Sequence, residues 1–121
     1  EWKIDNNKPV YIQLVEQLKV KIISGEIELD SKLDSVRSLA ADAMVNPNTM
    51  QKALAELERE GLVYSQRTAG RFVSDNKEKT DRLQEEMTME CIKTFVAQME
   101  KMGYKKEQII EMLNKYISEN K

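Results

Sequence analysis

The segment that most constrains the fold runs from residue 46 to residue 61, because it carries helix signals at both ends. Asn46 can accept hydrogen bonds from the free N–H groups of a first turn, and Pro47 suits the first helical position, where no donor is needed. Gly61 can adopt the left-handed conformation that follows a helix. The apolar residues between them recur at helical spacing: Met50, Ala53, Leu54 and Leu57. We therefore predict an amphipathic helix between Asn46 and Gly61.

The opposite side of this helix carries amides, a hydroxyl and an ammonium group near its N-terminus. Such groups bind base edges and phosphates. The residues are Asn48, Thr49, Gln51 and Lys52, with Glu56 and Arg59 further along. For the helix alone, an ordinary solvent-exposed face explains the pattern equally well.

A shorter helix is predicted immediately before it. Ser35 is a suitable N-cap for a helix that continues to about Met44, with only Val45 separating it from the next N-cap. Two helices joined so tightly form a helix-turn-helix. Arg37 lies in the first turn of the shorter helix, where a cation is unfavourable for the helix dipole. It is therefore solvated, paired with Asp34 or Glu56, or available to a ligand.

Residues 62–74 contain two short β-prone runs around a loop that holds Gly70. We predict a hairpin, so that the whole is a winged helix with the wing beside the second helix. Arg67 and Arg71 flank the loop and are expected to share one face with Arg37 and Lys52. Since the net charge is −2, DNA binding must depend on this local basic patch.

The N-terminal region is predicted to complete the core. Pro9 opens a helix whose apolar stripe continues to Gly25, with Lys19 and Lys21 on the exposed side. Trp2 and Ile4 are expected to pack beside this helix. Residues 26–34 are interpreted as a connector with three apolar anchors, Ile27, Leu29 and Leu33.

The C-terminal region is predicted to form a two-helix hairpin. A long helix ending at Gly103 carries Leu83, Met87, Cys91, Phe95 and Met99 at intervals of four. A second helix carries Ile109, Ile110, Leu113, Tyr116 and Ile117. Two wide apolar faces exceed what one hairpin can bury, so a second copy of the chain is the simplest partner. For the methionines and Cys91 we favour packing in the core over a ligand pocket or a redox sensor.

The composition argues against several function classes. Histidine is absent, the single cysteine excludes an intrachain disulfide, and the four glycines are too scattered for a phosphate-binding loop. We expect no enzyme, no metal site and no cofactor. No apolar run is long enough for a membrane span, and the cysteine usage suits the cytoplasm.

These residues resemble the GntR family of bacterial transcription regulators over about residues 8–74. The shared motifs are Pro9-Val10-Tyr11-Ile12-Gln13, Ser35-Val36-Arg37-Ser38-Leu39-Ala40, Asn46-Pro47-Asn48-Thr49-Met50, Ala53, Leu57-Glu58, Glu60-Gly61-Leu62-Val63, Gly70 and Phe72-Val73. The resemblance implies a winged helix that binds palindromic operators as a dimer. By position, it implies DNA contacts at Arg37, Asn46, Asn48, Thr49 and Gln51, and minor-groove contacts of the wing at Arg67, Thr68 and Gly70.

The chain departs from the family pattern at a few positions. Leu29-Asp30 stands where Pro-Gly is usual, and Asp34 stands where a proline is usual. Thr68 replaces a common wing glycine, and Gln51 replaces an arginine found in some relatives. The short C-terminal region is similar to that of the YtrA-like subfamily, whose C-terminal part is a helical dimerisation unit.

The expected fold is therefore mainly α with a small β-wing: a winged helix-turn-helix over residues 1–76, then a two-helix dimerisation hairpin over residues 77–121. The expected function is that of a homodimeric repressor on double-stranded DNA, with Lys52 and Arg71 added to the DNA-binding residues named above. The dimerisation residues are expected to be Leu83, Met87, Cys91, Phe95, Met99, Ile109, Leu113 and Tyr116. The alternative is a winged-helix dimer that acts as a protein-interaction adaptor. The sequence leaves open whether a small-molecule effector binds.

Overall fold

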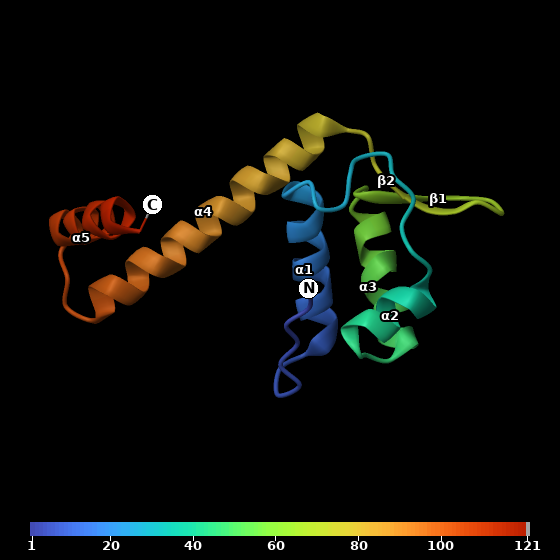
Figure 1. The fold of residues 1–121 in the computed structure, drawn as a ribbon, viewed down its shortest axis with the longest axis horizontal. Coiled ribbons are helices and arrows are strands. Elements are labelled where there is room, and N and C mark those ends of the chain that lie inside the picture. The colour runs from blue at the N-terminus through green and yellow to red at the C-terminus, as the bar shows by residue number, and fades with distance from the viewer. Residues whose placement is uncertain (121) are drawn as a thin grey trace. The chain divides into compact units, whose positions relative to one another are not determined.

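The computed structural model describes residues 1–120, which form five helices and one two-stranded sheet. In chain order these are α1 (Val10–Ile23), α2 (Val36–Ala43), α3 (Pro47–Arg59), β1 (Val63–Gln66), β2 (Gly70–Val73), α4 (Lys77–Lys101) and α5 (Lys106–Glu119) (Figure 1). The chain divides into two compact units, of which the first is Glu1–Gln84 and the second begins at Glu85, inside α4. The predicted class, mainly α with a small β-wing, is confirmed.

The core of the first unit lies between α1, α3 and the sheet. Its fully buried side chains are Leu14 and Leu18 from α1, Met50, Leu54 and Leu57 from α3, and Val63 and Val73 from the strands. The apolar stripes predicted for α1 and α3 therefore face each other. Trp2 and Ile4 pack against this core, as predicted. Hydrogen bonds hold their segment along α1, since the Gln17 amide bonds both backbone groups of Lys3.

The structure corrects the predicted exposure of Lys21. Its side chain is only 10% exposed, and its Nζ lies 2.8 Å from Glu26 Oε2 and 4.9 Å from the centre of the Trp2 ring. The hydrogen bond to Glu26 raises the pKa of Lys21. Lys19 is also partly covered, because it forms an ion pair with Glu60 at 2.9 Å. Both lysines therefore hold elements together rather than belonging to a solvated face.

The helix-turn-helix forms where the caps predicted it. The Ser35 side chain accepts a hydrogen bond from Ser38 N, and the Asn46 side chain accepts one from Asn48 N. The turn between α2 and α3 contains no glycine; instead, Met44 takes the left-handed conformation at φ 58°. The Met44 side chain is 90% exposed. An unbranched side chain in open solvent makes this backbone conformation tolerable.

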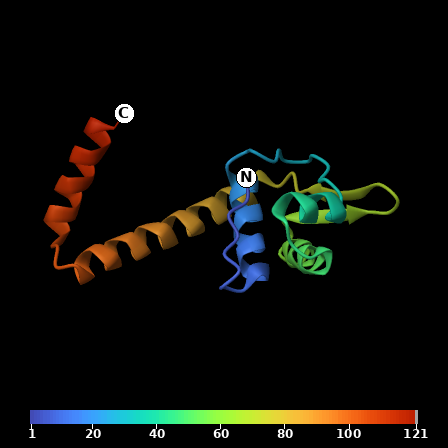
Figure 2. The same cartoon turned by 60° about the horizontal axis from the view of Figure 1, so that its bottom comes forward.

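The wing is a hairpin to which the connector adds a third segment. β1 and β2 are antiparallel, with Val63 opposite Val73 and Ser65 opposite Arg71. Along the other edge of β2, Leu33 N donates to Arg71 O at 2.9 Å, and Val73 N donates to Ser31 O at 2.9 Å. Lys32 is thereby bridged to Phe72. The sequence interpretation took residues 26–34 as a connector only and did not anticipate this pairing. β2 is consequently paired along both of its edges, with β1 and with the connector; the hairpin is the yellow-green element in Figure 2.

The second unit consists of the remainder of α4 and of α5, which are joined through Gly103 at φ 100°. Ile109 is buried within the single chain, whereas Ile110, Leu113, Tyr116 and Ile117 are exposed. Leu83 belongs to the first unit, where it packs against the core. Cys91, one of the predicted dimerisation residues, is exposed in the single chain. Among the described helices, none is both long and apolar enough to span a bilayer.

Candidate nucleic-acid interface

The N-terminal half of α3 presents polar groups to solvent and contains no acidic residue. Asn48, Gln51 and Lys52 are exposed and Thr49 is half-buried, while Met50 and Ala53 turn into the core. Asn46 uses its side-chain oxygen to cap the helix, with 2.7 Å to Asn48 N. The helix dipole adds partial positive charge at this end, which favours a bound anion.

The acidic residues of α3 lie in its C-terminal half, and cations pair with them. Arg59 Nε donates to Glu56 Oε1 at 2.9 Å, and this contact is the main reason that the pKa of Glu56 falls to about 2. Glu60, the residue after α3, pairs with Lys19. Glu58 accepts hydrogen bonds from Ser65 and Arg71, both on the wing. The negative charge in the C-terminal half of α3 is therefore locally compensated by cations.

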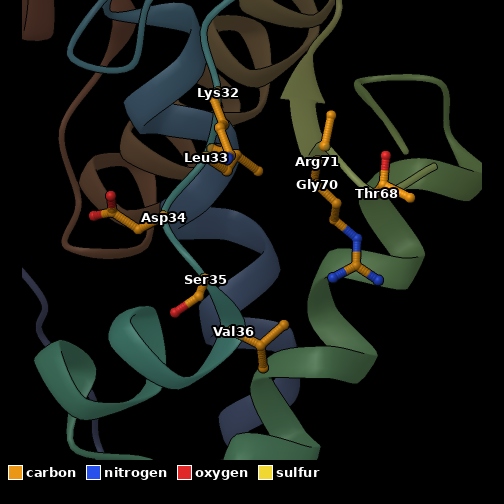
Figure 3. A pocket seen from close by; sticks show the side chains of 9 residues that line it. Lys32, Leu33, Asp34, Ser35, Val36, Thr68, Gly70 and Arg71 are labelled. Atoms are coloured by element: carbon orange, nitrogen blue, oxygen red, sulfur yellow. The ribbon is translucent and has the colours of Figure 1, made fainter. Parts of the chain in front are cut away.

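The tip of the wing is the turn Gln66–Ala69, closed by a hydrogen bond from Ala69 N to Gln66 O. Arg67 and Thr68 are exposed at this turn, and Thr68 holds a left-handed backbone at φ 64°. Thr68, Gly70 and Arg71 line one side of a cleft of about 620 Å³, while the other side is formed by Lys32, Asp34, Ser35 and Val36 (Figure 3). The wing residues therefore lie across a cleft from the first turn of α2.

Arg71 connects the wing to α3. Its side chain is 19% exposed; Nε donates to Glu58 Oε1 at 3.4 Å, and Nη1 donates to Gln51 Oε1 at 3.4 Å. In Figure 3 the guanidinium extends from β2 toward α3. Two of the predicted site residues, Gln51 and Arg71, are thus in direct contact. Arg71 is more enclosed than the sequence interpretation expected.

The other predicted cations are exposed. In the described part of the chain Arg37 forms no ion pair, so neither predicted carboxylate partner holds it; Glu56 binds Arg59 instead. Lys52 Nζ lies over the Tyr11 ring, 4.5 Å from its centre. Because Tyr11 lies on α1, this contact holds the ammonium group of Lys52 beside α1. The positive charge of Lys52 remains available to a ligand. Arg67 and Lys32 likewise have no carboxylate partner within residues 1–120.

Sequence reasoning missed Lys32 and Glu58. Lys32 stands in the cleft beside Gly70, where a Cβ added to the glycine would lie 3.2 Å from Lys32 Cε. The alternation of exposed Lys32 with buried Leu33 is a strand signal that could have identified this residue. Glu58 was noted only within the shared motif Leu57-Glu58, and its role was missed because that role depends on partners from two strands of the wing.

Asp30 and Tyr64 further support the wing. Asp30, at φ 62°, accepts a hydrogen bond from the Tyr64 hydroxyl at 3.0 Å, and this bond raises the pKa of Tyr64. The Tyr64 ring also stacks on Phe72, with 5.7 Å between ring centres. The two strands and the connector are therefore tied together behind the exposed turn.

Comparisons of this chain with a family model and with known proteins agree with one another. Residues 10–73 match the family model described as "Bacterial regulatory proteins, gntR family". The chain is 36% identical over 109 residues to the uncharacterized HTH-type transcriptional regulator YhcF of Bacillus subtilis, covering 90% of each protein. It is 36% identical over 110 residues to the HTH-type transcriptional repressor YtrA of the same organism, covering 89% of this chain and 84% of that protein.

Solved structures show the same relationship. A GntR family transcriptional regulator from Listeria monocytogenes superposes with a TM-score of 0.86 at 36% identity, covering 93% of this chain and 98% of the other. The DNA-binding domain of AraR, solved in complex with operator ORE1, superposes with a TM-score of 0.52 at 33% identity, covering 55% of this chain and 82% of the other.

Proposed function

The chain belongs to the GntR family of bacterial regulatory proteins, and from this we propose that it is a transcriptional repressor that binds a palindromic operator as a homodimer in the cytoplasm. Members of this family of HTH-type regulators are DNA-binding proteins rather than enzymes. The repressor role is supported by YtrA, which is named as a repressor, and the operator by the AraR complex.

The observation that carries the proposal is the acid-free polar face of α3 beside unpaired cations. In our proposal, Asn48 and Thr49 bind a phosphate at the N-terminus of α3, while Gln51 and Lys52 enter the major groove. Arg37 binds phosphate or a base edge from α2. Arg67, Thr68 and Gly70 bring the wing to the adjacent minor groove. We retain Asn46 as part of this surface, and we assign Arg71 a contribution through its contact with Gln51.

The homodimer is supported by the apolar side chains that the second unit leaves exposed. On α5, Ile110, Leu113 and Ile117 fall at helical spacing and are 61%, 43% and 55% exposed. On α4, Met89, Ile92 and Phe95 are also exposed. Exposure of such an apolar surface to water is unfavourable. A second copy of the chain can cover it with the same apolar surface.

Salt-dependent operator binding tests the proposal. Operators are first selected from random duplex DNA, and binding to the selected duplex is then measured at increasing salt. We expect a steep linear fall of log K against log salt, with a slope of roughly −0.9 for each phosphate contacted. Arg37→Ala should weaken binding and, if Arg37 contacts phosphate, reduce the slope by about 0.9.

Lys77→Ala is the control, since it also removes one exposed cation from the first unit, in this case one that pairs with Asp81 at 3.1 Å. Lys77 follows β2, and Ser74 N bonds to Leu62 O beside the C-terminal end of α3. It therefore lies away from the N-terminus of α3, and its loss should leave the slope unchanged. If no sequence is enriched and binding does not depend on salt, the repressor proposal fails and the adaptor hypothesis is favoured.

A further inference from the structure

The contact between Arg71 and Gln51 fixes the orientation of the Gln51 side-chain amide. Arg71 Nη1 donates to Gln51 Oε1 at 3.4 Å. A guanidinium has only donors, so the amide must turn its oxygen toward Arg71 and its NH₂ group away. The assignment of oxygen and nitrogen in this amide therefore follows from the chemistry of its neighbour.

Arg71 itself is held in place by a carboxylate. Glu58 Oε1 accepts from Arg71 Nε at 3.4 Å and from Ser65 Oγ at 3.0 Å. Glu58 and Gln51 lie on α3, Ser65 lies on β1 and Arg71 lies on β2. The four side chains form one hydrogen-bonded chain between the wing and the helix. Removing the guanidinium would leave the amide of Gln51 free to rotate.

The orientation of an amide decides which base it can read. A freely rotating glutamine pairs with adenine by donating to N7 and accepting from the N6 amino group. Arg71 engages one of the two lone pairs of the Gln51 oxygen and holds that oxygen toward the wing, so the two N–H donors are the groups of the amide that are directed away from the wing. Guanine presents two adjacent acceptors, N7 and O6, in the major groove, whereas thymine presents one and cytosine presents a donor.

We propose that Arg71 is a positioning residue that turns Gln51 into a reader of guanine in the operator. This inference rests on the proposed function, because it assigns one specificity-determining contact within that DNA complex. In this arrangement Arg71 faces α3 rather than the DNA backbone, and its charge is shared with Glu58. The alternative is that Arg71 leaves Glu58 on binding and contacts a phosphate.

Base preference at one operator position distinguishes these possibilities. That position is identified as the one whose preference disappears in Gln51→Ala when operators are selected from random duplex DNA. Equilibrium binding is then compared for two duplexes that differ only there, one with a G·C pair and one with an A·T pair. Wild-type protein should prefer the G·C duplex by roughly 5- to 150-fold, the range for one well-made pair of hydrogen bonds to a base.

Two substitutions of Arg71 provide the matched comparison. Arg71→Met frees the amide, so the preference should fall toward equality or pass to the A·T duplex, while preferences elsewhere in the operator stay unchanged. Arg71→Lys should retain the preference for G·C, because an ammonium also only donates. A cooperative thermal unfolding transition above the temperature of the binding measurement shows that each variant is folded.

Three results would overturn the inference. The first is a wild-type preference for adenine at this position. The second is an equal loss of binding to both duplexes in Arg71→Met together with a smaller salt slope, which identifies a phosphate contact. The third is that Gln51→Ala changes no position. In all three the protein still selects a specific operator, whereas failure of the proposed function gives no enriched sequence.

Discussion

Three non-glycine residues of the first unit adopt the left-handed conformation: Met44, whose turn is described above, Asp30 and Thr68. Asp30 has φ 62° and Thr68 has φ 64°. Asp30 is compensated by its hydrogen bond with Tyr64 and by the tolerance of aspartate for this region. Thr68 is β-branched, the side-chain type least suited to positive φ. The strain at Thr68 is therefore retained at the exposed turn of the wing, where a glycine would relieve it.

Thr68→Gly should stabilise the free protein. The substitution removes the unfavourable contact of Cβ with the backbone, which costs roughly 1–2 kcal/mol, but it adds unfolded-state entropy. We expect a net gain of up to about 1 kcal/mol in the free energy of unfolding, measured by urea denaturation without DNA. Ala69→Gly is the control. It adds unfolded-state entropy in the same way, but Ala69 has no positive φ, so no backbone strain is relieved in return. A lower stability for Thr68→Gly than for the wild type would contradict this account.

Helix α3 combines a structural residue and a proposed binding residue two positions apart. Asn46 caps the helix through its side-chain oxygen, while the Asn48 side chain is exposed at the same end. The resemblance to the family assigned both residues to the DNA. The structure adds that Asn46 also satisfies a backbone donor of α3.

Asn46→Ala and Asn48→Ala should therefore differ in their effect on stability. Loss of the cap in Asn46→Ala should lower the free energy of unfolding by about 1 kcal/mol. Asn48→Ala, at an exposed position, should change it by less than about 0.5 kcal/mol while weakening binding to the selected operator. Urea denaturation and operator titration of both variants provide the measurement. Equal stability of the two variants would show that the cap contributes little.

Local signals account for what the sequence predicted at the level of elements. The bounds of α2 and α3 were predicted because Ser35, Asn46 and Pro47 act within one turn of themselves, and the hairpin was predicted from Gly70 and its β-prone flanks. The pairing of residues 31–33 with β2 was missed, because it depends on a partner about 40 residues away. Lys21 was misplaced because its burial depends on Trp2 and Glu26, outside its own helix.

The site shows the same limit. The residue types at the N-terminus of α3 were readable from helical spacing, and the arginines of the wing from the hairpin. The chain that joins Ser65, Glu58, Arg71 and Gln51 was not readable, because it requires the register of β1 and β2 against the rotation of α3. Arg71 therefore looked like an exposed DNA contact although its side chain is mostly covered.

At the scale of the whole molecule, the second unit has apolar side chains that its own two helices do not cover. Burying Ile109 within the single chain uses one face of α5 and leaves Ile110, Leu113 and Ile117 on another. Acidic and basic residues, including Glu111 and Lys115, are interspersed along the helix and are also exposed. A homodimer that covers this apolar face would place two winged helices on one operator, as a palindrome requires.

Leu113→Glu should separate this dimer. A carboxylate at the centre of the apolar face would have to lose its hydration on association, which costs more than the contact returns. By light scattering at micromolar concentration we expect the wild type at twice the chain mass of 14.0 kDa and the variant near 14.0 kDa. Lys115→Glu is the control, because it introduces the same carboxylate on the same helix and changes the net charge by more than Leu113→Glu does. This variant should remain dimeric. A wild-type mass of 14.0 kDa, or a dimeric Leu113→Glu variant, would show that this face does not join the subunits.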